Sequence, residues 1–164
     1  MSKLEKRILL IFGMIVLAVA AAVLIRWGGE RDVIVNDFIP PSFDSAAVSG
    51  FPEGVDKTIY GTLILADGIA VSLYSAPTVT DGAAQVYFAS NEINTAWVRL
   101  RLLDAQGALL GETGLLRPGE YVESLILQTQ PKSAQVTAKI LTYEPDTYYS
   151  KGTATAQLTL RFAD

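Results

Sequence analysis

The chain contains neither cysteine nor histidine among its 164 residues. Without cysteine there is no disulfide framework, and without either residue type there is no Cys/His zinc site. Nucleophilic catalysis by Ser-His-Asp or Cys-His groups is excluded for the same reason. A metal ion would have only oxygen ligands available, which suit calcium or magnesium. We therefore expect a protein that is not an enzyme, with no catalytic residues, no cofactor and no metal site.

Charge is absent from one long stretch near the N-terminus, where residues 8–25 read ILLIFGMIVLAVAAAVLI. At about 1.5 Å per residue, a helix over this run is about 27 Å long, close to the roughly 30 Å hydrocarbon core of a bilayer. Arg26 and Trp27 follow the run and suit the headgroup interface. Basic residues precede it, so the positive-inside rule places the N-terminus in the cytoplasm and the remainder outside. We predict a cytoplasmic tail at residues 1–7 and a single transmembrane helix at residues 8–27.

Two other interpretations of this stretch are open. Ala18–Ala20 fits the small-x-small pattern of a cleaved signal peptide, but the apolar run continues to Ile25 and exceeds a usual signal core. A type IV pilin stalk needs a glutamate inside the run and a long continuing helix. This run has no acid, and Gly28 and the Pro40–Pro41 pair interrupt any extension. An uncleaved anchor is therefore favoured.

The two parts of the chain carry opposite net charge. Residues 1–31 hold five basic and two acidic side chains, whereas residues 32–164 hold eight basic and fifteen acidic ones. An acidic outer part argues against binding nucleic acid, which needs clustered lysine and arginine. We therefore expect the membrane as one partner, with the acidic part facing another extracytoplasmic protein or a second copy of the chain.

The acidic part divides into a linker and a domain. Residues 28–58 are rich in Gly, Pro, Ser and Asp without helical periodicity, which predicts a stalk or linker. Residues 59–164 instead alternate short runs rich in Val, Leu, Ile, Thr and Tyr with turn signals, which predicts an extracytoplasmic β-sandwich domain. The expected strands lie within residues 59–66, 69–75, 83–90, 96–104, 108–116, 120–127, 134–144 and 153–162.

Alternation within the runs predicts which side chains face the core. Val98, Leu100 and Leu102 should point inward, while Arg99 and Arg101 point outward. A second and a third inward set are predicted in the same way: Ala84, Val86 and Phe88 in one run, and Ala154, Ala156, Leu158, Leu160 and Phe162 in the last.

The stretch VRLRLLDAQGALLGETGLLRPGEYVESLIL, with its Pro-Gly turn before a strand, resembles the central hairpins of immunoglobulin-like domains on bacterial surfaces. The whole chain is similar to small, single-anchor extracytoplasmic proteins of Gram-positive bacteria. The resemblance implies an all-β, Ig-like antiparallel sandwich of about seven to eight strands behind one transmembrane helix. It lacks the cysteine pair of antibody domains, and it transfers no functional residues.

The last loop is the main candidate for recognition. YEPDTYYSKG joins the last two predicted strands and supplies Tyr143, Asp146, Tyr148 and Tyr149 as binding candidates. Tyrosine is a low-entropy contact residue in natural binding loops. An open alternative is that Tyr143 or Tyr148 folds back over the core, as in a tyrosine corner.

Outward side chains of the 96–104 run give further candidates. Arg99 and Arg101 could clamp a carboxylate or phosphate, or could simply be solvated charges. Trp97 could form an aromatic surface with Tyr74 and Tyr87, for a sugar or a peptide, or these rings could cap the core.

Acidic residues support two weaker alternatives. Asp67, Asp81 and Asp104 each precede a glycine and could bind calcium, but isolated Asp-Gly pairs are more typical of hairpin turns. Glu112, Glu120 and Glu123 could pair as general acid and base if they shared a cleft. The sequence therefore favours a non-catalytic module that makes protein contacts in a bacterial envelope or transfer assembly, with a cell-wall glycan-binding module and a carboxylate hydrolase as alternatives.

Overall fold

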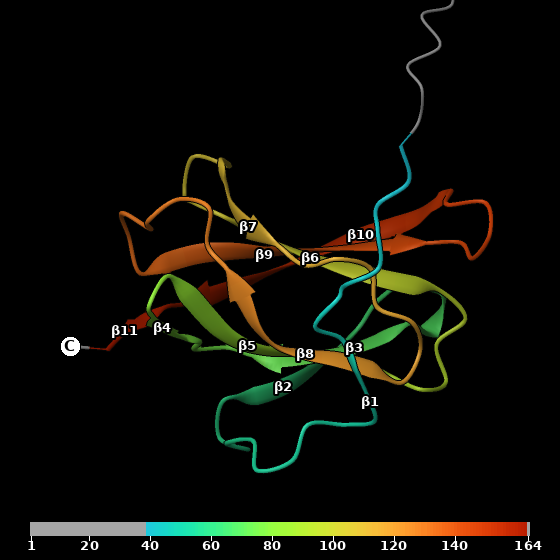
Figure 1. Cartoon of the computed structure of the whole chain (residues 1–164), viewed down its shortest axis with the longest axis horizontal. Helices are drawn as coiled ribbons and strands as arrows, with labels where there is room; N and C mark the ends of the chain where they lie inside the picture. Colours follow the sequence, from blue (N-terminus) through green and yellow to red (C-terminus); the bar gives the residue numbers. More distant parts are fainter. Residues whose placement is uncertain (1–38, 164) are drawn as a thin grey trace, which may run out of the picture. The chain divides into compact units, whose positions relative to one another are not determined.

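The computed structural model describes residues 39–163, which form two β-sheets packed face to face (Figure 1). The predicted transmembrane segment therefore lies outside the described residues. The strands and one 3₁₀ turn are β1 (Val48–Ser49), β2 (Tyr60–Ile64), η1 (Ala66–Gly68), β3 (Ala70–Tyr74), β4 (Thr78–Thr80), β5 (Ala83–Ser90), β6 (Trp97–Leu103), β7 (Leu109–Glu112), β8 (Glu120–Ile126), β9 (Gln135–Tyr143), β10 (Ser150–Thr159) and β11 (Arg161–Phe162).

The larger sheet has the order β1-β8-β5-β3-β2, with β4 joining β5 to β11. The smaller sheet has the order β10-β9-β6-β7. Every strand pair is antiparallel except β4 with β11. The prediction of an all-β sandwich is confirmed, because one face of each sheet is buried against the other.

Side-chain alternation builds the core as expected. On β6, Val98, Leu100 and Leu102 are fully buried, and on β5 Val86 and Phe88 face them from the other sheet. At about 25 cal/mol per Å² of apolar surface, each of these side chains contributes roughly 1.5–3 kcal/mol, which is the main favourable term for a chain without disulfides.

All eight expected strands are present, and the structure adds three short ones. β1, β4 and β11 have two or three residues each, too few for alternation to be read from the sequence. β4 and β5 form a hairpin around Asp81-Gly82, whose φ angles of 51° and 75° suit a tight turn of the kind that Asp-Gly favours.

One inward position was predicted wrongly. Phe162 was expected to continue the buried face of β10, but its side chain is 52% exposed. After the buried Leu160 the chain leaves the smaller sheet, and Arg161 N donates to Pro77 O beside β4. The alternation of inward and outward side chains does not continue when the chain passes from one sheet to the other. The sequence pattern of a single run does not show where such a change occurs.

The folded unit begins earlier than the predicted boundary at residue 59, because Ile39–Asp164 forms one compact unit. Asp44 N donates to Leu115 O and Leu115 N to Ser42 O, both at 2.9 Å. Val48 and Ser49 then pair with β8. Residues 39–58, expected within the stalk, therefore form part of the domain surface.

Candidate binding surface

The outward face of the smaller sheet gathers most of the predicted binding residues. Since Val98 and Leu100 are buried, Trp97, Arg99 and Arg101 point to the opposite side of β6. Cross-strand pairing places Trp97 opposite Tyr143, and Arg101 opposite Lys139.

The loop between β9 and β10 folds back over this face. Glu144 N donates to Tyr149 O at 2.8 Å, and Tyr148 N donates to Glu144 O at 3.0 Å. Asp146 and Tyr148 have φ angles of 66° and 58°, in the left-handed region that a bulky residue rarely adopts. Positive φ at a tyrosine costs of order 1 kcal/mol or more, so surrounding contacts must hold the loop in this shape.

The tyrosines of the loop take different positions. Tyr148 packs edge-on against Trp97, with ring centroids 5.0 Å apart and an interplanar angle of 64°. Tyr149 points into solvent with 73% of its surface exposed, and Asp146 is also exposed. Tyr148 therefore covers the outer face of the sheet rather than the core, and Tyr149 and Asp146 stay accessible.

The other side of Trp97 contacts a residue that the sequence interpretation placed in the linker. Phe43 packs edge-on against Trp97 at a centroid distance of 4.8 Å. The guanidinium carbon of Arg117 lies 3.6 Å from the centre of the Phe43 ring, as in a cation–π contact. Phe43 and Arg117 were missed because neither alternation nor a turn signal relates residue 43 to residues 97 and 117.

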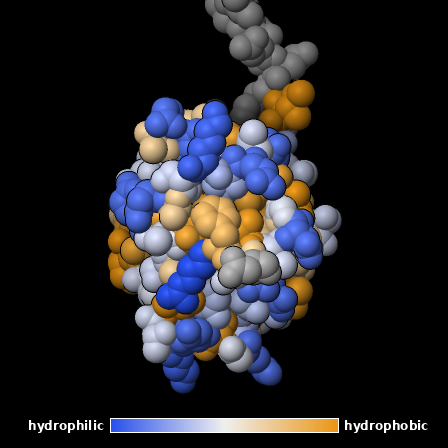
Figure 2. Space-filling model, turned by 90° about the vertical axis from the view of Figure 1, so that its left-hand side faces the viewer, coloured by the Kyte–Doolittle hydropathy of each residue, from blue (hydrophilic) through white to orange (hydrophobic). Residues whose placement is uncertain are grey.

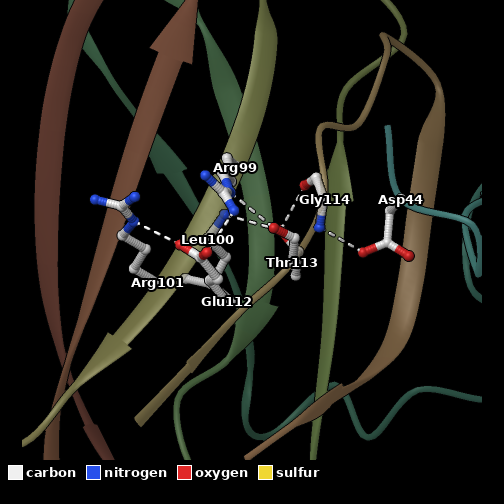
Figure 3. A network of polar contacts seen from close by, with 7 residues as sticks. All are labelled: Asp44, Arg99, Leu100, Arg101, Glu112, Thr113 and Gly114. Atoms are coloured by element: carbon white, nitrogen blue, oxygen red, sulfur yellow. Dashed lines mark hydrogen bonds and ion pairs between the residues drawn. The ribbon is translucent and has the colours of Figure 1, made fainter. Parts of the chain in front are cut away.

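Arg99 and Arg101 do form a carboxylate clamp, but the carboxylate belongs to the same chain (Figure 3). Arg99 Nη2 lies 2.6 Å from one Glu112 oxygen, and Arg101 Nε donates to the other at 2.8 Å. Arg99 Nε also donates to Thr113 O at 2.8 Å. The Arg99 side chain is only 15% exposed, whereas that of Arg101 is 36% exposed. Arg101 is therefore the more accessible of the two cations.

A polar chain connects this ion pair to the N-terminal segment of the domain (Figure 3). The Thr113 hydroxyl accepts from Leu100 N at 3.0 Å and donates to Gly114 O at 2.8 Å. Gly114 N donates to Asp44 Oδ2 at 2.7 Å. Because Asp44 neighbours Phe43, these bonds hold in place the residue that supports Trp97.

The strands of this face are basic within an acidic domain, and the loop between β9 and β10 adds the acids Glu144 and Asp146 beside them. Residues 39–163 hold twelve acidic and eight basic side chains. The strands of the smaller sheet hold four of those basic residues and only one acid, Glu112. We call Trp97, Arg101, Lys139, Tyr143 and Tyr148 the Trp97 face. It joins partly exposed aromatic rings to cations on a rigid sheet, an arrangement typical of contact surfaces.

The predicted aromatic surface of Trp97 with Tyr74 and Tyr87 does not form. Tyr74 and Tyr87 lie on β3 and β5 of the larger sheet and pack together at 4.8 Å. Tyr60 extends that cluster at 5.8 Å from Tyr74, and burial raises the pKa of Tyr60 to about 12, with Ser72 partly opposing the shift. Burial also raises the pKa of Tyr87, and the Glu123 carboxylate adds to this. Trp97 itself instead packs edge-on against Phe43 and Tyr148 and stays partly exposed.

The calcium alternative finds no support in residues 39–163, where no three acidic side chains lie close enough to share a metal ion. The carboxylate of Asp104 instead stabilises a turn. Asp104 Oδ1 accepts from Gln106 N at 2.9 Å and from Ala108 N at 2.8 Å.

The three glutamates of the hydrolase alternative are separated. Glu112 lies on β7 of the smaller sheet, and Glu120 and Glu123 lie on β8 of the larger one. Glu120 pairs with Arg117 at 3.2 Å, and Glu112 holds the two arginines described above.

A groove of about 650 Å³ is lined by one acid, Asp81, with Thr80, Gln128 and Phe162 among its walls. Figure 2 shows the end of the sandwich nearest β4 and β11, where hydrophobic groups gather in the middle of a largely hydrophilic surface. Neither paired carboxylates nor clustered cations converge there, so the groove offers no catalytic pair.

Comparisons with known proteins support no argument about this chain. No family model matches the chain, and no curated protein matches it. Among solved structures, CopC from Methylosinus trichosporium OB3b is similar with a TM-score of 0.34 and 14% identity, over 54% of this chain and 84% of that one. This similarity is too low to support an argument about function. Within residues 39–163, no helix is long and apolar enough to cross a bilayer.

Proposed function

We propose that this chain is a non-catalytic, membrane-anchored module whose extracytoplasmic sandwich binds another protein through the Trp97 face. The observation that carries the proposal is the convergence of Trp97, Tyr143 and Tyr148 with Arg101 and Lys139 on one outward sheet face. Tryptophan, tyrosine and arginine dominate the binding energy of protein interfaces. The partner would present an acidic surface, because the cations on these strands outnumber the acids.

The anchor and the location rest on the N-terminal sequence. An 18-residue uncharged run follows a basic tail, and the charge balance changes sign after it. Both features favour a helix that holds the domain on the outer side of a membrane. The absence of cysteine is compatible with that location.

We further propose that the sandwich is of the Ig-like class, in a bacterial envelope or transfer assembly. Support comes from the resemblance of the central hairpins and from the Pro-Gly turn before β8. Such domains present loops and sheet edges while the sandwich stays rigid, which suits a structural or adhesive contact.

Cross-linking in intact cells tests the proposal. A photo-cross-linking residue is placed at Tyr149, which is exposed beside the Trp97 face, and at Ser124, an exposed control on β8 of the other sheet. We expect a discrete protein adduct from position 149 and none from position 124. Equal adduct patterns from both positions, or none from 149, would contradict the proposal.

Labelling tests the location separately. The chain has no native cysteine, so Tyr149→Cys introduces a single thiol. A membrane-impermeant maleimide added to intact cells should label it fully. Labelling only after lysis would place the domain on the cytoplasmic side.

A further inference from the structure

β10 forms one edge of the smaller sheet, and among residues 39–163 it pairs with β9 alone. It is ten residues long, whereas β2, the edge strand of the larger sheet on the same side, has five. Residues next to both ends of β2 contact β10, since Leu65 directly follows β2 and Ser75 N donates to Ile59 O directly before it. Thr153 and Leu65 line one small pocket, and Thr159 N donates to Ser75 O at 3.0 Å. One side of the sandwich therefore presents two sheet edges together.

The hydrogen-bond pattern shows which groups of β10 face outward. Leu160 N, directly after β10, donates to Ala134 O, directly before β9, at 2.7 Å, so Leu160 occupies a bonded position of this ladder. Bonded pairs alternate along an antiparallel ladder, so the even-numbered residues of β10 bond to β9 and the odd-numbered ones face away. Thr159 is already bound to Ser75, and the register shifts before Gly152. The outward backbone groups without a sheet partner in the described part are therefore those of Thr153, Thr155 and Gln157.

Between Gly152 and Thr159 this edge has none of the usual protection against strand pairing, since the bulge and Lys151 lie before that stretch. Natural edge strands carry charges, prolines or bulges that prevent pairing with another chain. From Gly152 to Leu160, by contrast, β10 has no charged residue and no proline, and threonine alternates with alanine. Ala156 of β10 and, from the larger sheet, Leu63 and Leu65 are only partly buried against the core. The edge is thus open to a further strand, and apolar surface lies beneath it.

We propose that two copies of this chain associate through β10, antiparallel and centred on Thr155, to form one continuous eight-stranded sheet. This register uses every free outward group, with Thr155 opposite Thr155 of the second copy and Thr153 opposite Gln157. Two bonds for each bonded pair give about six backbone hydrogen bonds. This register also places no like charges opposite each other, because Lys151 lies opposite the uncharged Thr159 of the other copy.

A second copy fits this edge better than an acidic partner would. The domain is acidic overall, and the uncharged edge from Gly152 to Thr159 offers a contact between two copies without repulsion. Threonine side chains on the outward face meet threonine and glutamine, which form favourable cross-strand pairs. This edge adjoins the Trp97 face, because Thr155 pairs with Lys139 on β9, but Trp97 is not part of it, so Trp97→Ala separates the two proposals.

Single-cysteine variants of the full chain in detergent micelles test the register. The paired residues would be about 5.5 Å apart at Cα, within the range for a disulfide, whereas two copies of residue 153 would be more than about 10 Å apart. Under mild oxidation we expect Thr155→Cys to form homodimers rapidly. Thr153→Cys mixed with Gln157→Cys should cross-link at least about tenfold faster than either alone, because only the mixture places both thiols in register. Ser124→Cys, on β8, is the control.

Sedimentation equilibrium measures the dissociation constant independently. It also distinguishes association through β10 from association through the N-terminal segment, because only the former should respond to a change at Thr155. Thr155→Lys places like charges opposite each other and should raise the dissociation constant at least about tenfold, while Ser124→Lys leaves it unchanged. Trp97→Ala should also leave it unchanged. The proposal is overturned if the mixture cross-links no faster than its components, if Ser124→Cys cross-links as fast as Thr155→Cys, or if Thr155→Lys and Ser124→Lys behave alike.

Discussion

Replacing Gly114 with alanine should detach the segment that supports Trp97. A Cβ atom at Gly114 would overlap the backbone nitrogen and Cα of Asp44 and lie 2.7 Å from the carbonyl carbon of Phe43. These are backbone atoms, so no rotation of a side chain relieves the overlap. The segment around Phe43 and Asp44 must therefore move away from β6 and β7.

The cost follows from the contacts that the movement breaks. Three hydrogen bonds are lost: Gly114 N to Asp44 Oδ2, Asp44 N to Leu115 O, and Leu115 N to Ser42 O. At about 1 kcal/mol each they contribute about 3 kcal/mol. The Phe43–Trp97 ring contact adds about 0.5–1.5 kcal/mol. We expect Gly114→Ala to lower the free energy of unfolding by about 3.5–4.5 kcal/mol.

Denaturant unfolding followed by circular dichroism measures this change. The matched control is Gly61→Ala on β2, where an added Cβ meets no atom within 4 Å and the φ angle is not positive. The control should be neutral or more stable by up to about 1 kcal/mol, because glycine is unfavourable inside a strand. If Gly114→Ala is as stable as Gly61→Ala, the segment is not part of the folded domain and our reasoning is wrong.

Three further changes test the polar and titrating groups. Glu112→Gln leaves Arg99 and Arg101 together without their anion, and should lower the free energy of unfolding by about 1–2 kcal/mol at low salt. The loss should be smaller in 1 M salt, where the repulsion between the two arginines is screened. An equal loss at both salt concentrations would contradict an electrostatic role. Thr113→Val removes the acceptor for a buried backbone N–H of β6 and should cost about 1–3 kcal/mol, while Thr113→Ser, which keeps the hydroxyl, should cost clearly less. Because Tyr60 keeps its proton to about pH 12 when folded but loses it near pH 10 when unfolded, stability should fall between these values, by about 1 kcal/mol after allowing for solvent screening. Tyr60→Phe should remove that part of the pH dependence, and an unchanged profile would show that burial of this hydroxyl has no role.

Short-range sequence patterns were enough to predict the strands and their faces. Val98, Leu100 and Leu102 alternate with polar residues, and Asp81-Gly82 specifies a hairpin, so these features follow from adjacent residues alone. The alternation of apolar and polar residues predicts which residues share a face of a strand, but it does not predict which sheet the strand joins. For this reason Tyr74 was grouped with Trp97, although the two residues lie on different sheets.

Long-range pairings account for what the sequence could not predict. Asp44 and Gly114 are 70 residues apart, and their bond has no counterpart in any local pattern. Because residues 39–58 have the composition of a linker, they were not predicted to be part of the domain. The segment packs on the domain through backbone hydrogen bonds and one aromatic ring. The Arg99–Glu112 pair likewise depends on the β6–β7 hairpin register, which a bulge shifts.

The proposed function depends most on recognition by the Trp97 face. The most direct test is the yield of the photo-adduct from position 149 in intact cells, with and without Trp97→Ala. Trp97→Ala removes the ring against which Tyr148 packs, and truncation of a central aromatic residue typically costs an interface 2 kcal/mol or more. We predict that the yield falls at least about tenfold in Trp97→Ala and is unchanged in Ile126→Ala, an exposed apolar control on β8. A yield that is the same in both variants and in the unaltered chain would contradict the central claim.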